Sequence, residues 1–250
     1  MNSKFLHVLI LVVISAAMFF TSIGQVRLWD RDEPRNAGCA AEMLERGNYV
    51  VPIFNDELRF QKPVMLYWLM MSAYQVFGVN EFAARFWSAL LGIGTVLFTY
   101  LIARRLFDAT TALLAGVILC SSLMFCVAAR AATPDSTLIF FSTLAMLIYV
   151  MGVFRSAPTS EGTLNDNMPG TIGCVLLYAV LGLGVLTKGP VAFLIPTAII
   201  GMFLLLVRLP NRPQEENHGG IASRITNSIL ALVRPFHPVH FLQTCLQMRL

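Results

Sequence analysis

The sequence contains few charged side chains. Only 13% of its 250 residues are Asp, Glu, Lys or Arg, whereas 56% are apolar, and the mean hydropathy is +0.69. An ordinary soluble domain carries about 25% charged residues. This shortage of charge excludes a typical soluble enzyme and predicts an integral membrane protein.

Several common signatures are also missing. The five cysteines include no Cys-x-x-Cys pair, which argues against a disulfide framework or a cysteine metal site. The net charge of +4 is not gathered into a basic stripe, so we expect no nucleic-acid partner. The sequence has no P-loop, His-Glu-x-x-His or Gly-x-Ser-x-Gly pattern, which removes the common nucleotide-binding, zinc-protease and hydrolase signatures.

Long windows without Asp, Glu, Lys or Arg are abundant. Each is near the roughly 20 residues that a membrane-spanning helix needs, and backbone in hydrocarbon must satisfy its own hydrogen bonds, which favours helices. We therefore predict an all-α integral membrane protein with about six transmembrane helices. The windows are 5–26 (apart from His7), 86–103, 109–129, 136–154, 167–187 and 189–207.

The first window could also be a cleaved secretory signal, with Lys4 in its positive region. Its apolar stretch is longer than the roughly 7 to 15 residues of such a signal, and no clean Ala-x-Ala site follows. A retained anchor helix is the better interpretation.

The longest polar stretch, 25–62, follows the first window. Within it, 33–46 is predicted to be a helix, capped by Asp32 or Glu33, with Pro34 in its first turn and Gly47 at its end; a loop is predicted over 48–58. The apolar run 63–80 could span a thin bilayer, but Tyr67 and its aromatic neighbours favour the membrane interface. We expect an interfacial helix there, with a seventh span as the alternative.

An interfacial helix at 63–80 decides which loops share a side of the membrane. The 18 Lys and Arg residues then divide equally between the two sides, and discounting the long first loop makes the Arg104 to Arg234 side cytoplasmic. The first loop, about 25–81, is then external, and the connectors at about 155–169 and 208–240 are cytoplasmic. The ionisable residues expected together on the external side include Asp30, Asp32, Glu33, Arg35, Lys62, Arg130, Asp135 and Lys188.

This external set could carry chemistry. Asp32 could take a proton from an acceptor at the membrane surface, although helix capping is the ordinary alternative. Arg35, Lys62 and Lys188 could hold a lipid-linked phosphate, although snorkelling to the interface is the ordinary role of such cations. Asp135 follows Pro134 at a helix start, where an acid is favourable on electrostatic grounds alone.

Seven short motifs occur in an order and spacing that resemble the GT-C membrane glycosyltransferases, specifically the lipid A aminoarabinose transferases and related protein mannosyltransferases. The motifs are Asp32-Glu-Pro-Arg35, Glu42-Met-Leu-Glu-Arg-Gly-Asn48, Phe60-Gln-Lys-Pro63 with Tyr67-Trp68, Phe77-Gly-Val-Asn-Glu-Phe-Ala-Ala-Arg85, Ala103-Arg-Arg-Leu-Phe107, Thr133-Pro-Asp135 and Leu186-Thr-Lys-Gly-Pro190.

The resemblance implies a GT-C bundle in a bacterial inner membrane with a periplasmic active face. It implies a polyprenyl-phosphate sugar donor, a lipid A, protein or other glycan acceptor, and inversion at the anomeric carbon. Asp32 would be the catalytic carboxylate, and Arg35, Lys62 and Lys188 would lie near the carrier phosphate. The cavity would include Glu33, Tyr67 and Asp135.

Two departures from the family follow. Gln61 stands where the family usually has Glu before Lys62, which argues against a divalent metal held by that carboxylate. Family members also continue beyond six spans, so we expect this sequence to be the N-terminal part of such an enzyme, and inactivity of this part alone is one alternative. The alternatives are a truncated non-catalytic product and a transporter component, although a transporter would place ionisable groups near the bilayer midplane.

Overall fold

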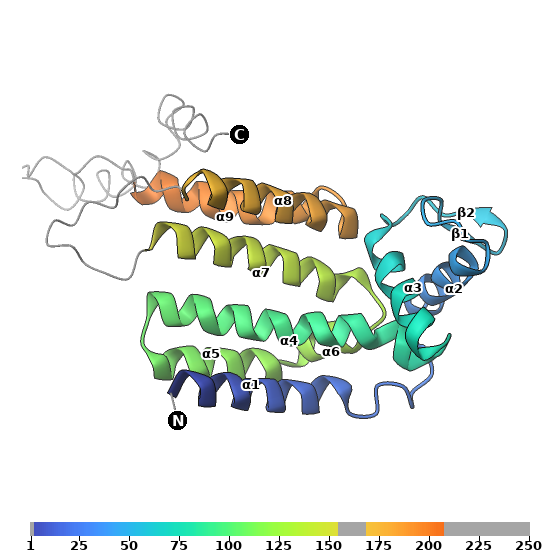
Figure 1. Ribbon diagram of the computed structural model, residues 1–250, viewed down its shortest axis with the longest axis horizontal. Helices are drawn as coiled ribbons and strands as arrows, with labels where there is room; N and C mark the ends of the chain where they lie inside the picture. Colours follow the sequence, from blue (N-terminus) through green and yellow to red (C-terminus); the bar gives the residue numbers. More distant parts are fainter. Residues whose placement is uncertain (1–2, 155–168, 208–250) are drawn as a thin grey trace, which may run out of the picture. The chain divides into compact units, whose positions relative to one another are not determined.

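The computed structural model describes residues 3–154 and 169–207 (Figure 1). The predicted connectors at about 155–169 and 208–240 lie outside these residues, apart from Pro169. The regular secondary structure of the described part consists of helices and one two-stranded hairpin. Residues Met1–Leu194 belong to one compact unit, to which the following description of packing applies.

Within the part of the chain that the structure describes, four helices are long and apolar enough to cross a membrane. They are α1 (Ser3–Phe20), α4 (Glu81–Leu106), α7 (Pro134–Val153) and α8 (Thr171–Lys188). The chain is therefore a multi-pass helical membrane protein, as predicted. Each of these helices coincides with one of the predicted windows.

The other two predicted windows are also helical, but neither is one long straight span. The window 109–129 contains α5 (Ala109–Ser121) and α6 (Leu123–Arg130), which meet at a bend of 64° and could together form a broken span. The break occurs because Ser122 has an extended backbone, with φ −66° and ψ 124°. The last window contains α9 (Val191–Val207), whose 17 residues reach about 26 Å at 1.5 Å per residue, less than the roughly 30 Å hydrocarbon core.

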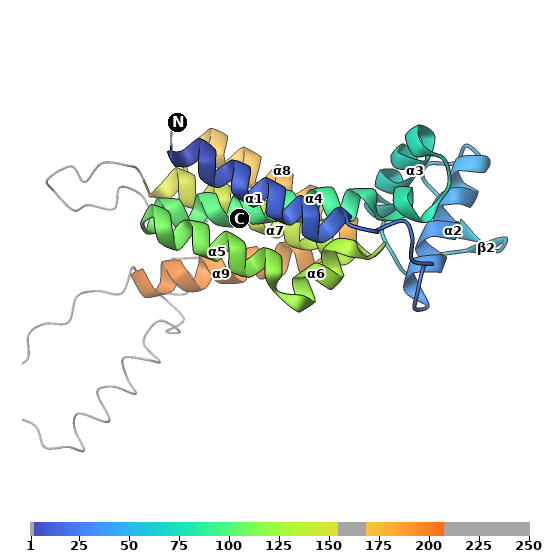
Figure 2. The same ribbon diagram turned by 90° about the horizontal axis from the view of Figure 1, so that it is seen from below.

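Helix α4 lies at the centre of the bundle and packs against α1, α3, α5, α6 and α7 (Figures 1 and 2). Its small residues allow close approach: a Cβ added to Gly92 would lie 2.8 Å from the Cβ of Ala129 on α6. The buried residues Leu11 and Phe19 place α1 in the same core. The bundle is thus closed by apolar side chains.

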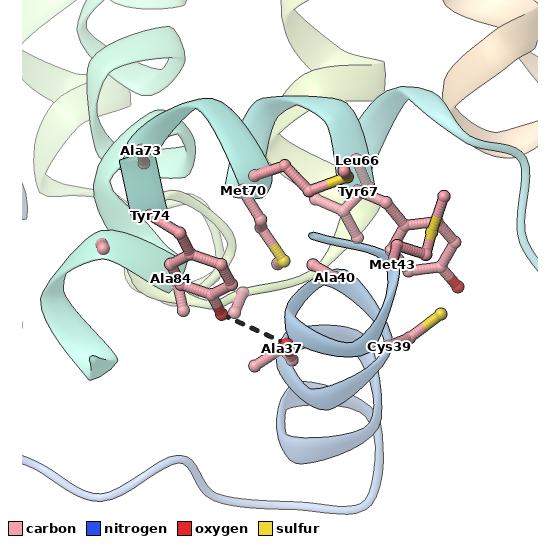
Figure 3. Close-up of a cluster of buried hydrophobic side chains, with 13 residues drawn as sticks. Ala37, Cys39, Ala40, Met43, Leu66, Tyr67, Met70, Ala73, Tyr74 and Ala84 are labelled. Atoms are coloured by element: carbon pink, nitrogen blue, oxygen red, sulfur yellow. Dashed lines mark hydrogen bonds between the residues drawn. The ribbon is translucent and has the colours of Figure 1, made fainter. Parts of the chain in front are cut away.

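Helices α2 (Asp32–Glu45) and α3 (Met65–Phe77) pack together, and α3 also packs against α4. Their shared core includes Ala37, Ala40 and Met43 of α2 and Tyr67 and Tyr74 of α3 (Figure 3). Tyr74 Oη donates a hydrogen bond to the Ala37 carbonyl at 3.3 Å. With 13 residues, α3 reaches about 20 Å and is too short to cross the hydrocarbon core. This length favours the predicted non-spanning helix over a seventh span.

The bounds of α2 agree with the prediction to within one residue. Gly47 has φ 62°, and the amides of Gly47 and Asn48 donate to the carbonyls of Leu44 and Met43 at 3.1 and 3.0 Å, which is the expected glycine-assisted helix end. The predicted cap is wrong, however: Arg31 is the N-cap residue and its side chain caps nothing. The Glu33 carboxylate instead forms buried contacts described below.

The predicted loop over 48–58 contains a small hairpin. Strands β1 (Ile53–Phe54) and β2 (Glu57–Leu58) pair antiparallel, with Ile53 opposite Leu58 and Phe54 opposite Glu57. Between the strands, Asn55 and Asp56 have φ values of 54° and 62°. Asn and Asp tolerate this left-handed region, which two-residue hairpin turns require. Each strand has only two residues, which is too short to show the alternation of apolar and polar residues by which a strand is predicted.

Candidate functional site

A buried ion pair joins the start of α2 to α4. The side chains of Glu33 and Arg85 are only 2% and 5% exposed. Arg85 Nε donates to Glu33 Oε1 at 2.9 Å, and Arg85 Nη2 donates to Glu33 Oε2 at 2.6 Å. This bidentate contact fixes the orientation of both side chains.

The Glu33 carboxylate also accepts two backbone amides. Ala132 N–H donates to Oε1 at 2.6 Å and Trp29 N–H donates to Oε2 at 3.0 Å. Burial alone would raise the pKa of Glu33, but the Arg85 hydrogen bonds and the amides of Ala132 and Trp29 together lower the pKa below its ordinary value. Glu33 is therefore an ionised structural anchor between α2, α4 and the segment before α7.

Arg85 also binds the chain that leaves α1. Its Nη1 donates to the carbonyls of Ile23 and Val26 at 2.8 and 2.7 Å, and its Nη2 donates to the carbonyl of Arg27 at 3.1 Å. One guanidinium thus satisfies the backbone between α1 and α2 while holding Glu33. Arg85 therefore holds the chain on both sides of Asp32: it binds backbone carbonyls before Asp32 and the Glu33 carboxylate after it.

A second set of buried hydrogen bonds extends from α2 to the hairpin and α3. Asn36 Nδ2 donates to the Ala132 carbonyl at 3.0 Å, and Asn36 Oδ1 accepts from Arg59 Nη2 at 3.0 Å. Arg59 Nε donates to Tyr67 Oη at 3.0 Å. Burial, as the largest cause, raises the pKa of Tyr67 to about 12, so this phenol stays protonated at neutral pH.

Asp32 lies on the accessible side of this framework. Lys62 Nζ is 3.7 Å from Asp32 Oδ2, and the two side chains are 22% and 50% exposed. The chain returns from the hairpin to α3 at Lys62, whereas Asp32 begins α2. A partly exposed carboxylate is therefore held beside a partly exposed ammonium group.

A second ion pair joins α7 to α8. Lys188 Nζ binds Asp135 Oδ1. Asp135 lies in the first turn of α7, and Lys188 is the last residue of α8, which ends at Gly189 with φ 77°. The two side chains are 45% and 37% exposed, so this pair is also accessible.

The two accessible ion pairs lie next to the same junction in the chain. Asp32 is adjacent to Glu33, and Asp135 is three residues beyond Ala132, whose backbone is bound by both Glu33 and Asn36. The residues expected on one side of the membrane are thus brought to one end of the bundle (Figure 1).

The other predicted site residues lie differently. Arg35 is exposed and forms no ion pair with another described residue. Glu33 and Tyr67, expected to line the cavity, are buried in the framework behind Asp32. Within residues 3–154 and 169–207, no three side chains of His, Cys, Asp or Glu are grouped so that they could hold a metal ion.

Sequence reasoning missed Asn36, Arg59 and Arg85, which form the framework. Arg85 carried a signal: it is the only charged residue of α4 outside the first and last turns of that helix. Such a charge needs a partner when it is buried. Glu33 was the available acid, but only the fold shows that the two residues meet.

Comparisons with known proteins agree with this architecture. The family model described as dolichyl-phosphate-mannose-protein mannosyltransferase matches residues 4–230. The chain is 37% identical over 214 residues to an uncharacterized protein of Aquifex aeolicus, covering 84% of this chain and 39% of that protein.

A second relative has a functional name. The chain is 34% identical over 170 residues to the undecaprenyl phosphate-alpha-4-amino-4-deoxy-L-arabinose arabinosyl transferase of Enterobacter sp., covering 68% of this chain and 29% of that enzyme. The chain therefore spans about two fifths or less of the length of these relatives.

Two crystal structures of ArnT from Cupriavidus metallidurans have a similar fold. The apo structure has a TM-score of 0.70 at 25% identity and covers 96% of this chain and 42% of that chain. The structure bound to undecaprenyl phosphate has a TM-score of 0.67 at 24% identity and covers 99% of this chain and 40% of that chain. The helical arrangement is thus that of a known integral membrane fold.

Proposed function

Because the chain belongs to the dolichyl-phosphate-mannose-protein mannosyltransferase family, we propose that the protein transfers a sugar from a polyprenyl-phosphate carrier to an envelope acceptor. The name of the Enterobacter relative, which specifies an undecaprenyl-phosphate sugar, supports this class of donor. The acceptor is lipid A, a protein or another glycan. The reaction takes place at the external face of the bacterial inner membrane.

The observation that carries this proposal is the position of Asp32. Its carboxylate is half exposed, stands 3.7 Å from Lys62 Nζ, and belongs to a helix fixed by the buried Glu33–Arg85 pair. A general base must be accessible to its acceptor and rigidly placed. Asp32 meets both conditions, whereas the neighbouring Glu33 is buried and already bound to four donors.

In the proposed reaction, the acceptor oxygen attacks the anomeric carbon of the carrier-bound sugar. The bond from this carbon to the phosphate oxygen breaks, and the electron pair leaves with the polyprenyl phosphate. Asp32 takes the proton of the acceptor. Attack opposite the leaving phosphate inverts the anomeric configuration.

The departing phosphate gains negative charge, which nearby cations stabilise. Lys62 and Lys188 are each held by a carboxylate that remains partly exposed. Such ion pairs contribute little to stability, about 0–1 kcal/mol, so the ammonium groups can exchange a carboxylate for phosphate at low cost. Arg35, exposed on the first turns of α2, supplies a third cation.

The test is sugar transfer by purified full-length protein carrying Asp32→Asn, with undecaprenyl-phosphate-linked sugar as donor. Loss of a general base is expected to lower the rate about 10²- to 10⁴-fold. Asp56→Asn is the matched control, because Asp56 is also an exposed carboxylate paired with a cation, Arg46. Transfer by Asp32→Asn at the rate of Asp56→Asn would exclude Asp32 as the base.

A further inference from the structure

A pocket of about 580 Å³ lies at the end of the bundle opposite α2 and α3. The N-terminal end of α1 and the C-terminal end of α4 border it, and Figures 1 and 2 show both of these ends far from the hairpin. The motif Ala103-Arg-Arg-Leu-Phe107 contributes to its wall. The proposed transfer reaction gives this motif no role.

The pocket is basic. Three cations line it: Lys4, Arg104 and Arg105. Neither Lys4 nor Arg104 forms an ion pair with another residue of the described part. Asp108, the next acid along the chain, uses its carboxylate to cap α5 by accepting the amides of Thr110 and Thr111 at 2.8 and 3.1 Å.

Arg104, one of these lining cations, has a buried nitrogen without an acceptor in the described part of the chain. Arg104 Nη1 is buried from solvent and has no hydrogen-bond partner within the described residues. A buried charged donor without an acceptor costs free energy, and a guanidinium is well matched to phosphate because it presents paired N–H groups. Because Arg104 lines the pocket, a phosphate that enters is expected to pair with its guanidinium.

The remaining walls are apolar, including Val8, Leu101 and Met151. Phe107, which lines the pocket, is 64% exposed, and Phe5 on α1 is 59% exposed. A free anion gains nothing from these surfaces. A phospholipid places its phosphate among cations and its acyl chains along apolar helix surface, so it matches both parts of the site.

We propose that this pocket binds the phosphate headgroup of an anionic phospholipid, with the acyl chains lying along α1. Lys4 and Arg104, which form no ion pair with another described residue, favour a net negative headgroup over a zwitterionic one. Basic pockets between membrane helices on the cytoplasmic side bind anionic lipids in this way. The site is separate from Asp32 and does not depend on the proposed transfer reaction.

The test measures lipid binding by the purified full-length protein in detergent, using phosphatidylglycerol, phosphatidylcholine and inorganic phosphate as probes. Phosphatidylglycerol is expected to bind more tightly than phosphatidylcholine and to resist displacement by inorganic phosphate. Arg104→Gln and Lys4→Gln should each weaken phosphatidylglycerol binding about fivefold, since one basic residue near a membrane surface contributes about 1 kcal/mol. Phosphatidylcholine binding should not change.

Arg46→Gln is the control, because Arg46 is an exposed cation that immediately follows α2, at the other end of the bundle. It should bind both lipids as the unmodified protein does. Lys4→Gln guards against a folding defect, since Lys4 is exposed. Equal affinity for the two lipids, or full phosphatidylglycerol binding by both variants, would overturn the proposal. Ready displacement of phosphatidylglycerol by inorganic phosphate would assign the pocket to free phosphate instead.

Discussion

Arg85 of α4 holds both carboxylate oxygens of Glu33 of α2, at 2.9 and 2.6 Å, with both side chains almost completely buried. This contact joins residues 52 positions apart. It binds the polar segment after α1 to the membrane bundle, and Asp32 is the residue next to it. The rigid placement of Asp32 therefore depends on the Glu33–Arg85 pair.

Removing either partner should destabilise the protein strongly. Arg85→Ala leaves a buried carboxylate without its cation, and Glu33→Ala leaves a buried guanidinium, each of which is expected to cost about 3–5 kcal/mol. Arg46→Ala, which breaks only exposed ion pairs with Glu42 and Asp56, should cost less than about 1 kcal/mol. Thermal unfolding in detergent measures the difference. Equal losses for Arg85→Ala and Arg46→Ala would contradict the structural role of the pair.

The stability contribution of Glu33 should depend on pH. Because the folded-state pKa of Glu33 lies below its ordinary value, the folded protein favours the ionised carboxylate. The stabilisation is present above the unfolded pKa, about 4.3, and is lost as the pH falls through the lower folded pKa. Unfolding free energy measured from neutral pH downward should therefore decline on the acidic side of about pH 4.3.

Glu33→Gln should remove its share of this acid-induced loss, because the amide does not titrate. Part of the decline should remain, since hydrogen bonds from Thr111 also lower the pKa of Asp108. An unchanged acid profile in Glu33→Gln would show that Glu33 does not contribute as the structure indicates.

The sequence predicted the bundle better than the framework of the site. The spans could be located because long uncharged windows must be helical in hydrocarbon. The sequence predicted that Asp32, Lys62, Asp135 and Lys188 lie on one side of the membrane, but it did not predict which of them pair. The break at Ser122 was missed because an extended residue within an apolar run leaves the hydropathy unchanged.

The burial of Glu33 and Tyr67 could not be read from the sequence for a different reason. Their partners, Arg85 and Arg59, are selected by how α4 and the hairpin pack. The sequence around a charged residue near the membrane surface is the same whether its side chain faces a cavity or pairs with a buried partner. Only the three-dimensional arrangement separates Asp32, which is accessible, from Glu33, which is not.

Lys62 and Lys188 should affect donor binding more than turnover if they hold the carrier phosphate. Each Lys→Gln change should raise the KM for the polyprenyl-phosphate donor about tenfold or more, since a hydrogen bond to a charged group contributes about 1.5–3 kcal/mol. Lys→Arg at the same position keeps the charge and should restore much of the binding. Steady-state kinetics with Arg46→Gln as control tests this, and an unchanged donor KM in both Lys→Gln variants would exclude the assignment.

The side of the membrane that the site faces can be tested with single cysteines. In a variant without the five native cysteines, Glu57→Cys would mark the hairpin and Thr110→Cys would mark the start of α5, and both positions are exposed. An impermeant maleimide should label Glu57→Cys in intact cells, whereas Thr110→Cys should react only after the membrane is opened.

The two positions must give opposite results, because they lie at opposite ends of the bundle (Figure 1). Labelling of Thr110→Cys alone in intact cells would show that the bundle has the opposite orientation in the membrane. Asp32 would then face the cytoplasm, which contradicts transfer at the external face. The basic pocket would also face outward, away from the cytoplasmic leaflet whose anionic lipids attract basic residues. One labelling experiment therefore tests the orientation on which both proposals rely.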